Sequence, residues 1–243
     1  MDTFNSYILF ALILLPLLGA GVLMLIPGYR PQTIRWTASL FALVTMLLTM
    51  YTTLVYYLDY REAGGLQFVR TWHWLELPGS WPLGHQAITL TLGIDGIAAP
   101  MLLLTGVVMF TGVLMSWTIT DRNKDYFVLY FMLLTGVFGV FATQDMFFFF
   151  LFYELAVLPM YLLIGVWGSS TDFGTFLRTK EYGAMKLVLY LVAGSVLIWI
   201  AILAIFVEAG LGTFNITELE KVAFSETFQR VFFPFIMVGF GVL

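Results

Sequence analysis

Long apolar runs separated by short polar connections make up most of this 243-residue chain. A helix of about twenty apolar residues, each adding about 1.5 Å, crosses the roughly 30 Å hydrocarbon core of a bilayer. Six runs have that length, at about residues 7–26, 34–57, 90–118, 126–142, 144–168 and 181–206. A seventh begins at Val231 and is still apolar at Leu243, so we expect a piece of a longer protein. The pattern predicts an all-α fold: a polytopic transmembrane helix bundle of six full spans and the start of a seventh.

One polar connection, residues 59–90, is much longer than the others. Its alternating pieces QFVRTWHW and QAITLTL are typical of a small hairpin or an amphipathic segment at the membrane surface. Asp95 stands just before the third apolar run, where we expect it to cap a helix N-terminus.

The basic residues of the short connections predict the orientation of the chain. The first, third and fifth connections carry six of them: Arg30, Arg35, Arg122, Lys124, Arg178 and Lys180. The longer connections on the other side carry Arg61, Arg70, Lys221 and Arg230. This bias places the first set in the cytoplasm, and therefore the N-terminus outside.

Composition supports a membrane protein and excludes several functions. The chain is 60% hydrophobic and 11% charged, whereas a soluble domain has about 25% charged residues. Its net charge of -4 is scattered, so no basic patch for nucleic acid is expected. With no cysteine and only two histidines, His73 and His85, we expect no catalytic residue, cofactor site or metal site in this chain.

Glu154 is the one acidic residue in the middle of an apolar span, within QDMFFFFLFYELAVLPMYLLIGVWG at residues 144–168. A carboxylate at that depth costs at least about 2.5 kcal/mol, so it usually faces a partner or a wet cavity. Pro159 should kink this helix, because its ring cannot donate a hydrogen bond and clashes with the carbonyl of Leu155. We interpret Glu154 as a protonatable site; the alternative is a neutral, hydrogen-bonded structural residue.

Lys186 is the corresponding basic residue, about 8 Å along the sixth helix from Glu181. Glu154 lies about 13 Å from the other face of the membrane, so the two groups differ in depth. They could meet if a helix tilts, or communicate through a bridging water. A Glu and a Lys in a low-dielectric bundle make a proton relay, because moving one charge changes whether the other keeps its proton. The alternative for Lys186 is snorkelling from a helix end.

Three stretches resemble the antiporter-like membrane subunits of proton-translocating NADH-quinone oxidoreductase, respiratory complex I, most closely the chain M or chain 4 type. They are LGIDGI at 92–97, FFFFLFYELAVLPMYLLIGVWG at 147–168 and AMKLVLYLVAGS at 184–195. The resemblance implies an inverted-repeat antiporter-like fold, of which this chain is an N-terminal part. Residues 1–125 would hold three helices and an extracytoplasmic loop at about 59–90, and residues 126–243 the first part of the repeat.

The same resemblance implies the function. The essential fifth-helix glutamate of the family falls on Glu154, and a lysine often found in the sixth helix falls on Lys186. The chain would move protons through this relay, driven by quinone reduction in partner subunits that hold the flavin, the iron–sulfur clusters and the quinone. The expected partners are the lipid bilayer and the other membrane-arm subunits of a hetero-oligomer in a bacterial cytoplasmic membrane.

Three alternatives remain at this point. The chain could belong to a multi-subunit sodium/proton antiporter or to a membrane-bound hydrogenase. It could also be a non-pumping structural membrane subunit, in which case Glu154 should tolerate glutamine.

Overall fold

Six helices of the computed structural model are long and apolar enough to cross a membrane, counted within the residues it describes, 2–63, 65–77, 86–172 and 177–242. They are α1 (Asp2–Leu25), α2 (Pro31–Ala63), α3 (Ala98–Met115), α4 (Asn123–Ala142), α5 (Met146–Trp167) and α6 (Lys180–Ala209). The prediction of six spans is confirmed. Helices form here because a backbone in lipid must satisfy its own hydrogen bonds.

Shorter elements connect and follow the spans. They are β1 (Gln67–Leu77), β2 (Gln86–Ile94), the 3-10 turn η1 (Ser116–Thr118), β3 (Thr171–Asp172), β4 (Leu177–Arg178), α7 (Ile216–Leu219) and α8 (Glu226–Val242). β1 and β2 pair in a two-stranded sheet, so the hairpin predicted within 59–90 is present. β3 and β4 form a second, antiparallel pair.

Helix ends follow local capping signals. The Asp95 carboxylate accepts hydrogen bonds from the N–H groups of Ile97, at 3.1 Å, and Ala98, at 2.7 Å, which confirms it as a cap. α8 begins before the apolar run at Val231, because the Ser225 hydroxyl accepts a hydrogen bond from the N–H of Phe228 at 3.2 Å. A polar helical turn therefore precedes the apolar part of α8.

The chain divides into two compact units. Unit 1 comprises Met1–Arg70, Leu92–Thr143 and Phe152–Leu163, and unit 2 comprises Thr71–Thr91, Gln144–Leu151 and Ile164–Leu243. The division after residue 125 rests on the expected repeat rather than on compactness, and it stays a prediction.

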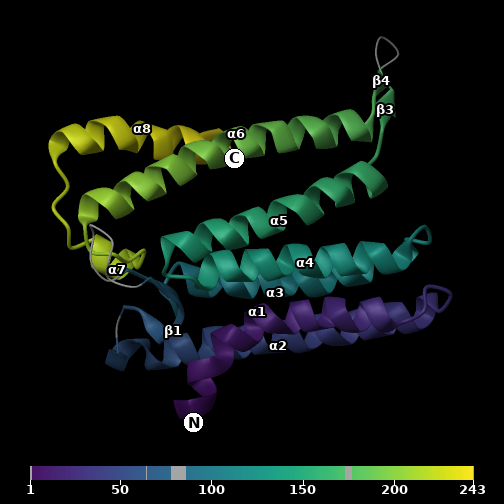
Figure 1. Cartoon of the computed structure of the whole chain (residues 1–243). Coiled ribbons are helices and arrows are strands. Elements are labelled where there is room, and N and C mark those ends of the chain that lie inside the picture. The colour runs from purple at the N-terminus through teal and green to yellow at the C-terminus, as the bar shows by residue number, and fades with distance from the viewer. Residues whose placement is uncertain (1, 64, 78–85, 173–176, 243) are drawn as a thin grey trace. The chain divides into compact units, whose positions relative to one another are not determined.

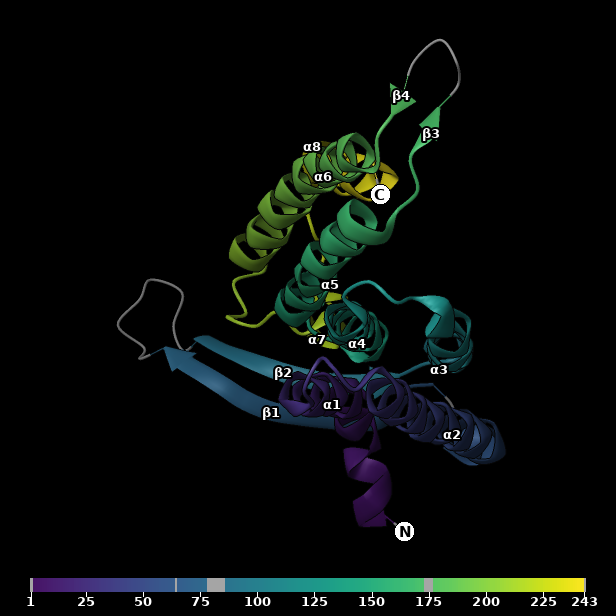
Figure 2. The same ribbon diagram turned by 90° about the vertical axis from the view of Figure 1, so that its right-hand side faces the viewer.

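In unit 1, the helices α1, α2, α3 and α4 pack side by side (Figure 2), and the unit also includes residues 152–163 of α5. α1 packs on α2 and α4, and α3 also packs on α2 and α4. Phe127, Phe131 and Phe138 are fully buried along one face of α4, at spacings of four and seven residues. That spacing keeps large side chains on a single stripe of a helix, so α4 provides much of the aromatic core.

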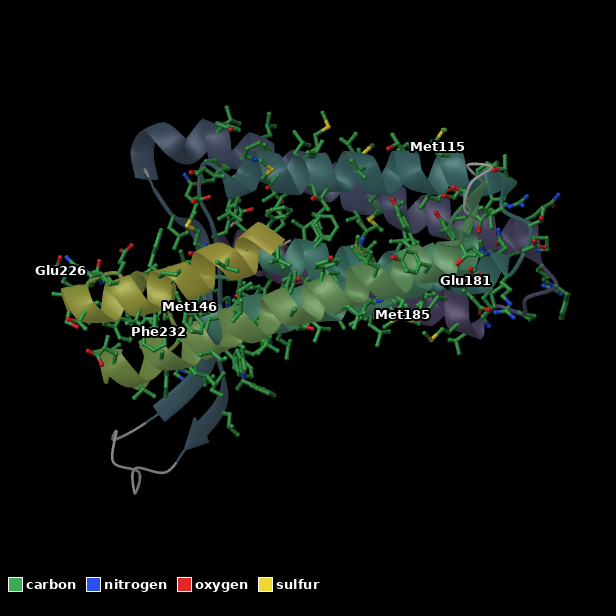
Figure 3. All side chains as sticks on the ribbon, turned by 90° about the horizontal axis from the view of Figure 1, so that it is seen from above. Met115, Met146, Glu181, Met185, Glu226 and Phe232 are labelled. Atoms are coloured by element: carbon green, nitrogen blue, oxygen red, sulfur yellow. The ribbon has the colours of Figure 1, made fainter. Side chains whose placement is uncertain are left out.

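In unit 2, α8 folds back along α6 (Figure 1). Figure 3 shows Glu181 toward one end of α6 and Glu226 toward the other end of the pair. A Cβ atom on Gly194 would lie only 2.9 Å from the Gly239 carbonyl oxygen. Glycine at both positions lets the two backbones approach closely, as is common between transmembrane helices.

Candidate functional site

Asp145 starts the helix that carries the candidate site. It is completely buried, and its Oδ1 accepts hydrogen bonds from the N–H groups of Phe147, at 2.9 Å, and Phe148, at 3.1 Å. Burial raises the pKa of this carboxyl from 3.8 to about 6, although the two backbone hydrogen bonds act in the opposite direction. Asp145 was not singled out from the sequence. An aspartate beside an apolar run is typical of a helix cap, but nothing local to it indicates its burial.

Three segments distant in the sequence meet around Asp145 in unit 2. The Asp145 backbone pairs with that of Asn215, and the Asn215 amide donates a hydrogen bond to the Thr91 hydroxyl at 3.4 Å. Three further backbone hydrogen bonds complete this junction: Gln144 N to Thr91 O at 2.8 Å, Met146 N to Phe214 O at 2.9 Å, and Ile216 N to Gln144 O at 2.9 Å. The start of α5 is therefore held by β2 and by the segment that follows α6.

An aromatic cluster covers the same junction. The Phe147 ring lies 5.9 Å from Trp199 and 5.8 Å from Phe214, measured between centroids. Phe150 stacks on Trp199 at 4.7 Å. Together with Ile198 and Ile202 of α6, these rings form the core of unit 2. Such ring pairs stabilise a structure beyond their buried area, so they hold the N-terminal turns of α5 in place.

The middle of α5 packs tightly against α4 in unit 1. A Cβ atom on Gly136 would lie 2.7 Å from the Phe152 carbonyl oxygen and 2.9 Å from the Ala156 Cβ. Glycine is therefore required for the two helices to touch. Glu154 lies two residues from both Phe152 and Ala156, and a helix turns about 100° per residue, so Glu154 is on the side of α5 opposite α4.

Glu154 is half-buried, and its Oε1 atom is buried without a hydrogen-bond partner among the residues that the structure describes. The hydroxyl of the adjacent Tyr153 is also buried without a hydrogen-bond partner among the described residues. Buried polar groups normally have partners, and an exception calls for a ligand, water or proton acceptor. Glu154 is thus an acid within a span whose Oε1 atom has unused hydrogen-bonding capacity among the described residues.

Pro159 is buried inside α5, which continues as a helix through it to Trp167. Because proline has no N–H, the Leu155 carbonyl does not receive the usual helical hydrogen bond from position 159. That acceptor lies one residue from Glu154 in the sequence. The kink expected at Pro159 stays a prediction.

Lys186 lies within the span of α6 and is exposed on this chain. Its ammonium group is 5.7 Å from the centroid of the Tyr190 ring. A shallow hollow of about 360 Å³ surrounds it, lined by Tyr182, Met185, Leu189, Tyr190 and Ala193. Glu154 belongs to unit 1 and Lys186 to unit 2. The position of each residue is described only within its own unit, so contact between them stays a prediction.

Among the described residues, no three His, Cys, Asp or Glu side chains are grouped so that they could hold a metal ion. His73 lies on β1, and His85 lies outside the described residues.

Residues 143–243 match the family described as NADH:quinone oxidoreductase/Mrp antiporter, TM. Nearly the whole chain is similar to NAD(P)H-quinone oxidoreductase chain 4. It is 31% identical to that of Gloeobacter violaceus, with 95% of this chain and 40% of the relative covered. It is 33% identical to that of a Synechococcus species, with 95% and 39% covered. The chain therefore spans about 40% of the length of these relatives.

Solved structures with the same fold come from several complexes. A chain of respiratory complex I from Thermus thermophilus with bound NADH aligns with a TM-score of 0.73 at 22% identity, over 96% of this chain and 42% of that one. A chain of the Mrp complex from Dietzia aligns with a TM-score of 0.73 at 20% identity, over 98% and 40%. A chain of an archaeal membrane-bound sulfane sulfur reductase aligns with a TM-score of 0.66 at 21% identity, over 96% and 42%.

The family match includes α5, the helix that carries Glu154, and the aligned structures share the fold of nearly the whole chain. This chain is an integral membrane protein with an antiporter-like fold, and its residues 143–243 are similar to the family described as NADH:quinone oxidoreductase/Mrp antiporter, TM.

Proposed function

We propose that this chain is a proton-translocating membrane-arm subunit of a bacterial NADH-quinone oxidoreductase, in which Glu154 and Lys186 transfer protons. The observation that carries the proposal is the buried Glu154 Oε1 atom, which lies in a span and lacks a hydrogen-bond partner within the described residues. The similarity to chain 4 of NAD(P)H-quinone oxidoreductases supports the same assignment.

In this function the chain moves protons without performing redox chemistry. Glu154 holds or releases a proton according to the charges near it, and Lys186 is a second group whose protonation changes with its surroundings. The energy comes from quinone reduction in partner subunits, which also hold the flavin and the iron–sulfur clusters. The helix pair α4 and α5 keeps Glu154 at a fixed depth, because Gly136 locks the two backbones together.

The proposed orientation has the N-terminus outside and the short basic connections in the cytoplasm. Within unit 1, Lys124 donates a hydrogen bond to the Met24 carbonyl at 2.5 Å, and Arg35 donates one to the Ile119 carbonyl at 3.0 Å. Cations near helix C-termini are favourable because the terminal carbonyls carry partial negative charge. These basic side chains therefore both stabilise helix ends and support the positive-inside orientation.

The test is the substitution Glu154→Gln in the full-length chain within its complex, measured as proton pumping per NADH oxidised in membrane vesicles. Glutamine keeps the shape of the side chain but cannot release a proton, so we expect pumping and coupled NADH oxidation to collapse while the complex still assembles. The matched control is Glu208→Gln, an exposed residue at the end of α6. Normal pumping with Glu154→Gln would refute the proton role and favour a structural subunit.

A sodium/proton antiporter subunit is the second candidate, favoured by the equal TM-score to the Mrp complex chain. Purification with flavin and iron–sulfur subunits supports the oxidoreductase. Purification with small membrane chains alone, together with sodium-dependent proton movement, supports the antiporter.

A further inference from the structure

The beginning of α2 meets the turn between α3 and α4 at one backbone carbonyl of unit 1, that of Ile119. The Arg35 Nη2 atom donates a hydrogen bond to this oxygen at 3.0 Å, and the Asn123 Nδ2 atom donates another at 2.9 Å. Beside them, the Trp117 indole N–H donates a hydrogen bond to the Ser39 hydroxyl at 3.2 Å. Because Ser39 follows Arg35 by one helical turn, both lie on the same face of α2. These residues together form the Ile119 cluster.

Two atoms of the Ile119 cluster have unused hydrogen-bonding capacity. The Arg35 Nε atom and the Asn123 Oδ1 atom are each buried without a hydrogen-bond partner within the residues that the structure describes. Asn123 as a whole is only 5% exposed. Leaving a buried donor or acceptor unsatisfied is costly, so two such atoms in one cluster call for a ligand.

The ligand must be small, because this chain already covers both atoms. Neither the Arg35 Nε atom nor the Asn123 Oδ1 atom presents surface to the exterior of the chain. A lipid or a further protein segment therefore cannot contact them unless the cluster opens. A single water molecule is small enough to lie inside it.

The contacts with Ile119 fix the chemistry of the two atoms. A carbonyl oxygen accepts hydrogen bonds and donates none, so the amide atom of Asn123 that faces it is the nitrogen, and the amide oxygen points away. Nε and Nη2 belong to one rigid, planar guanidinium, so the Nε–H of Arg35 is held close to the same carbonyl. The cluster therefore offers a ligand one donor and one acceptor.

This combination selects a neutral ligand that both accepts and donates. The Asn123 oxygen disfavours an anion, and the Arg35 guanidinium disfavours a metal cation. A water oxygen accepts from Nε while one of its hydrogens is donated to Oδ1. The Ser39 hydroxyl accepts from Trp117 and still has a proton to donate, so it is a third polar group in the same cluster.

We propose that the Ile119 cluster binds a water molecule, which bridges Arg35 Nε and Asn123 Oδ1 and joins α2 to the turn between α3 and α4. With the Ile119 carbonyl, this water gives each of the two side chains a second hydrogen bond. Arg35 is then anchored to the neighbouring helices through both nitrogens of one side of its guanidinium. The site is separate from Glu154 and Lys186 and does not depend on proton translocation.

The experiment is a cryo-electron microscopy structure of the full-length protein in its complex, at a resolution that shows ordered water. We expect a density peak at about 2.7–3.2 Å from both Arg35 Nε and Asn123 Oδ1. Direct contact between these two atoms, a peak that touches only one of them, or density of a lipid or a protein segment there would overturn the proposal. The parent protein alone decides this result, so it does not depend on the folding of any variant.

The substitution Arg35→Lys tests the energetic role of the bridge. Lysine keeps the charge and can still donate to the Ile119 carbonyl, but it has no Nε–H, so we expect the peak to disappear and Tm to fall by at least about 2 °C. The matched control is Arg122→Lys, because Arg122 is an exposed arginine of the same turn, and there both the peak and Tm should be unchanged. A peak that persists unchanged in Arg35→Lys would show that Nε does not hold the water.

Discussion

Replacing Asp145 with asparagine should remove a pH dependence from the stability of this protein. Asparagine keeps the shape of the side chain and an oxygen that accepts the hydrogen bonds of Phe147 and Phe148, but it cannot be ionised. The folded protein binds a proton at Asp145 more tightly than the unfolded chain, because burial raises the pKa from 3.8 to about 6. Stability from this group is therefore fully present below about pH 4 and is lost as the pH rises through about 6.

The magnitude follows from the same shift. A tenfold change in proton affinity corresponds to about 1.4 kcal/mol, so ionising the buried Asp145 costs the folded state at most about 3 kcal/mol relative to the unfolded state. For a chain of this size that corresponds to several degrees in Tm. We expect Asp145→Asn to be more stable than the parent protein by up to this amount at pH 7.5, and by only about 1 kcal/mol at pH 4.5.

The assay is thermal unfolding of the full-length protein in lipid nanodiscs at several pH values, followed by tryptophan fluorescence. Only the difference between parent and variant is interpreted, so that other titrating groups cancel. The matched control is Asp95→Asn, because Asp95 caps α3 with the same two types of hydrogen bond but is exposed. If Asp145→Asn and the parent lose stability in parallel between pH 4.5 and 7.5, the reasoning about burial at Asp145 is wrong.

Two further outcomes follow from the geometry of the helices. Gly136→Ala should destabilise the protein by about 1–3 kcal/mol, because the new methyl group would meet the Phe152 carbonyl at 2.7 Å. Gly21→Ala, which meets no atom of the described chain within 4 Å, should be neutral or slightly stabilising in the same unfolding assay; equal effects of the two would contradict the packing argument. Lys186→Met should lower proton pumping severalfold with assembly intact, whereas the exposed Lys221→Met should not; pumping that survives in both variants would leave Lys186 as a snorkelling residue.

The spans, the hairpin and the Asp95 cap followed from the sequence because each depends on local chemistry. An apolar run long enough to cross a bilayer has few structures open to it other than a helix, whatever its neighbours are. Alternation over 67–74 and 86–92 favoured a small hairpin or an amphipathic surface segment, and an aspartate before an apolar run favoured a cap. Glu154 was also chosen as a candidate from local sequence alone, since a single acid in an apolar span is conspicuous without knowledge of any contact; its role stays a prediction.

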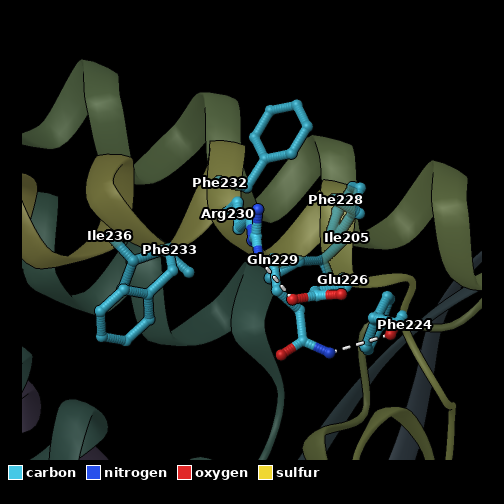
Figure 4. A pocket seen from close by; sticks show the side chains of 9 residues that line it. All are labelled: Ile205, Phe224, Glu226, Phe228, Gln229, Arg230, Phe232, Phe233 and Ile236. Atoms are coloured by element: carbon cyan, nitrogen blue, oxygen red, sulfur yellow. Dashed lines mark hydrogen bonds and ion pairs between the residues drawn. The ribbon is translucent and has the colours of Figure 1, made fainter.

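The role of Asp145 was decided by the tertiary structure. Its burial comes from β2 and the 213–216 segment, which are separated from it by about fifty residues or more of sequence and meet only when unit 2 folds. The same holds for a hollow beside Arg230 (Figure 4), because Ile205 and Phe233 come from two different helices, α6 and α8, which pack along each other in unit 2. Hydropathy along the sequence indicates which residues are buried away from water. It does not indicate which helix each apolar face packs against, because helix packing depends on side chains from segments far apart in the chain.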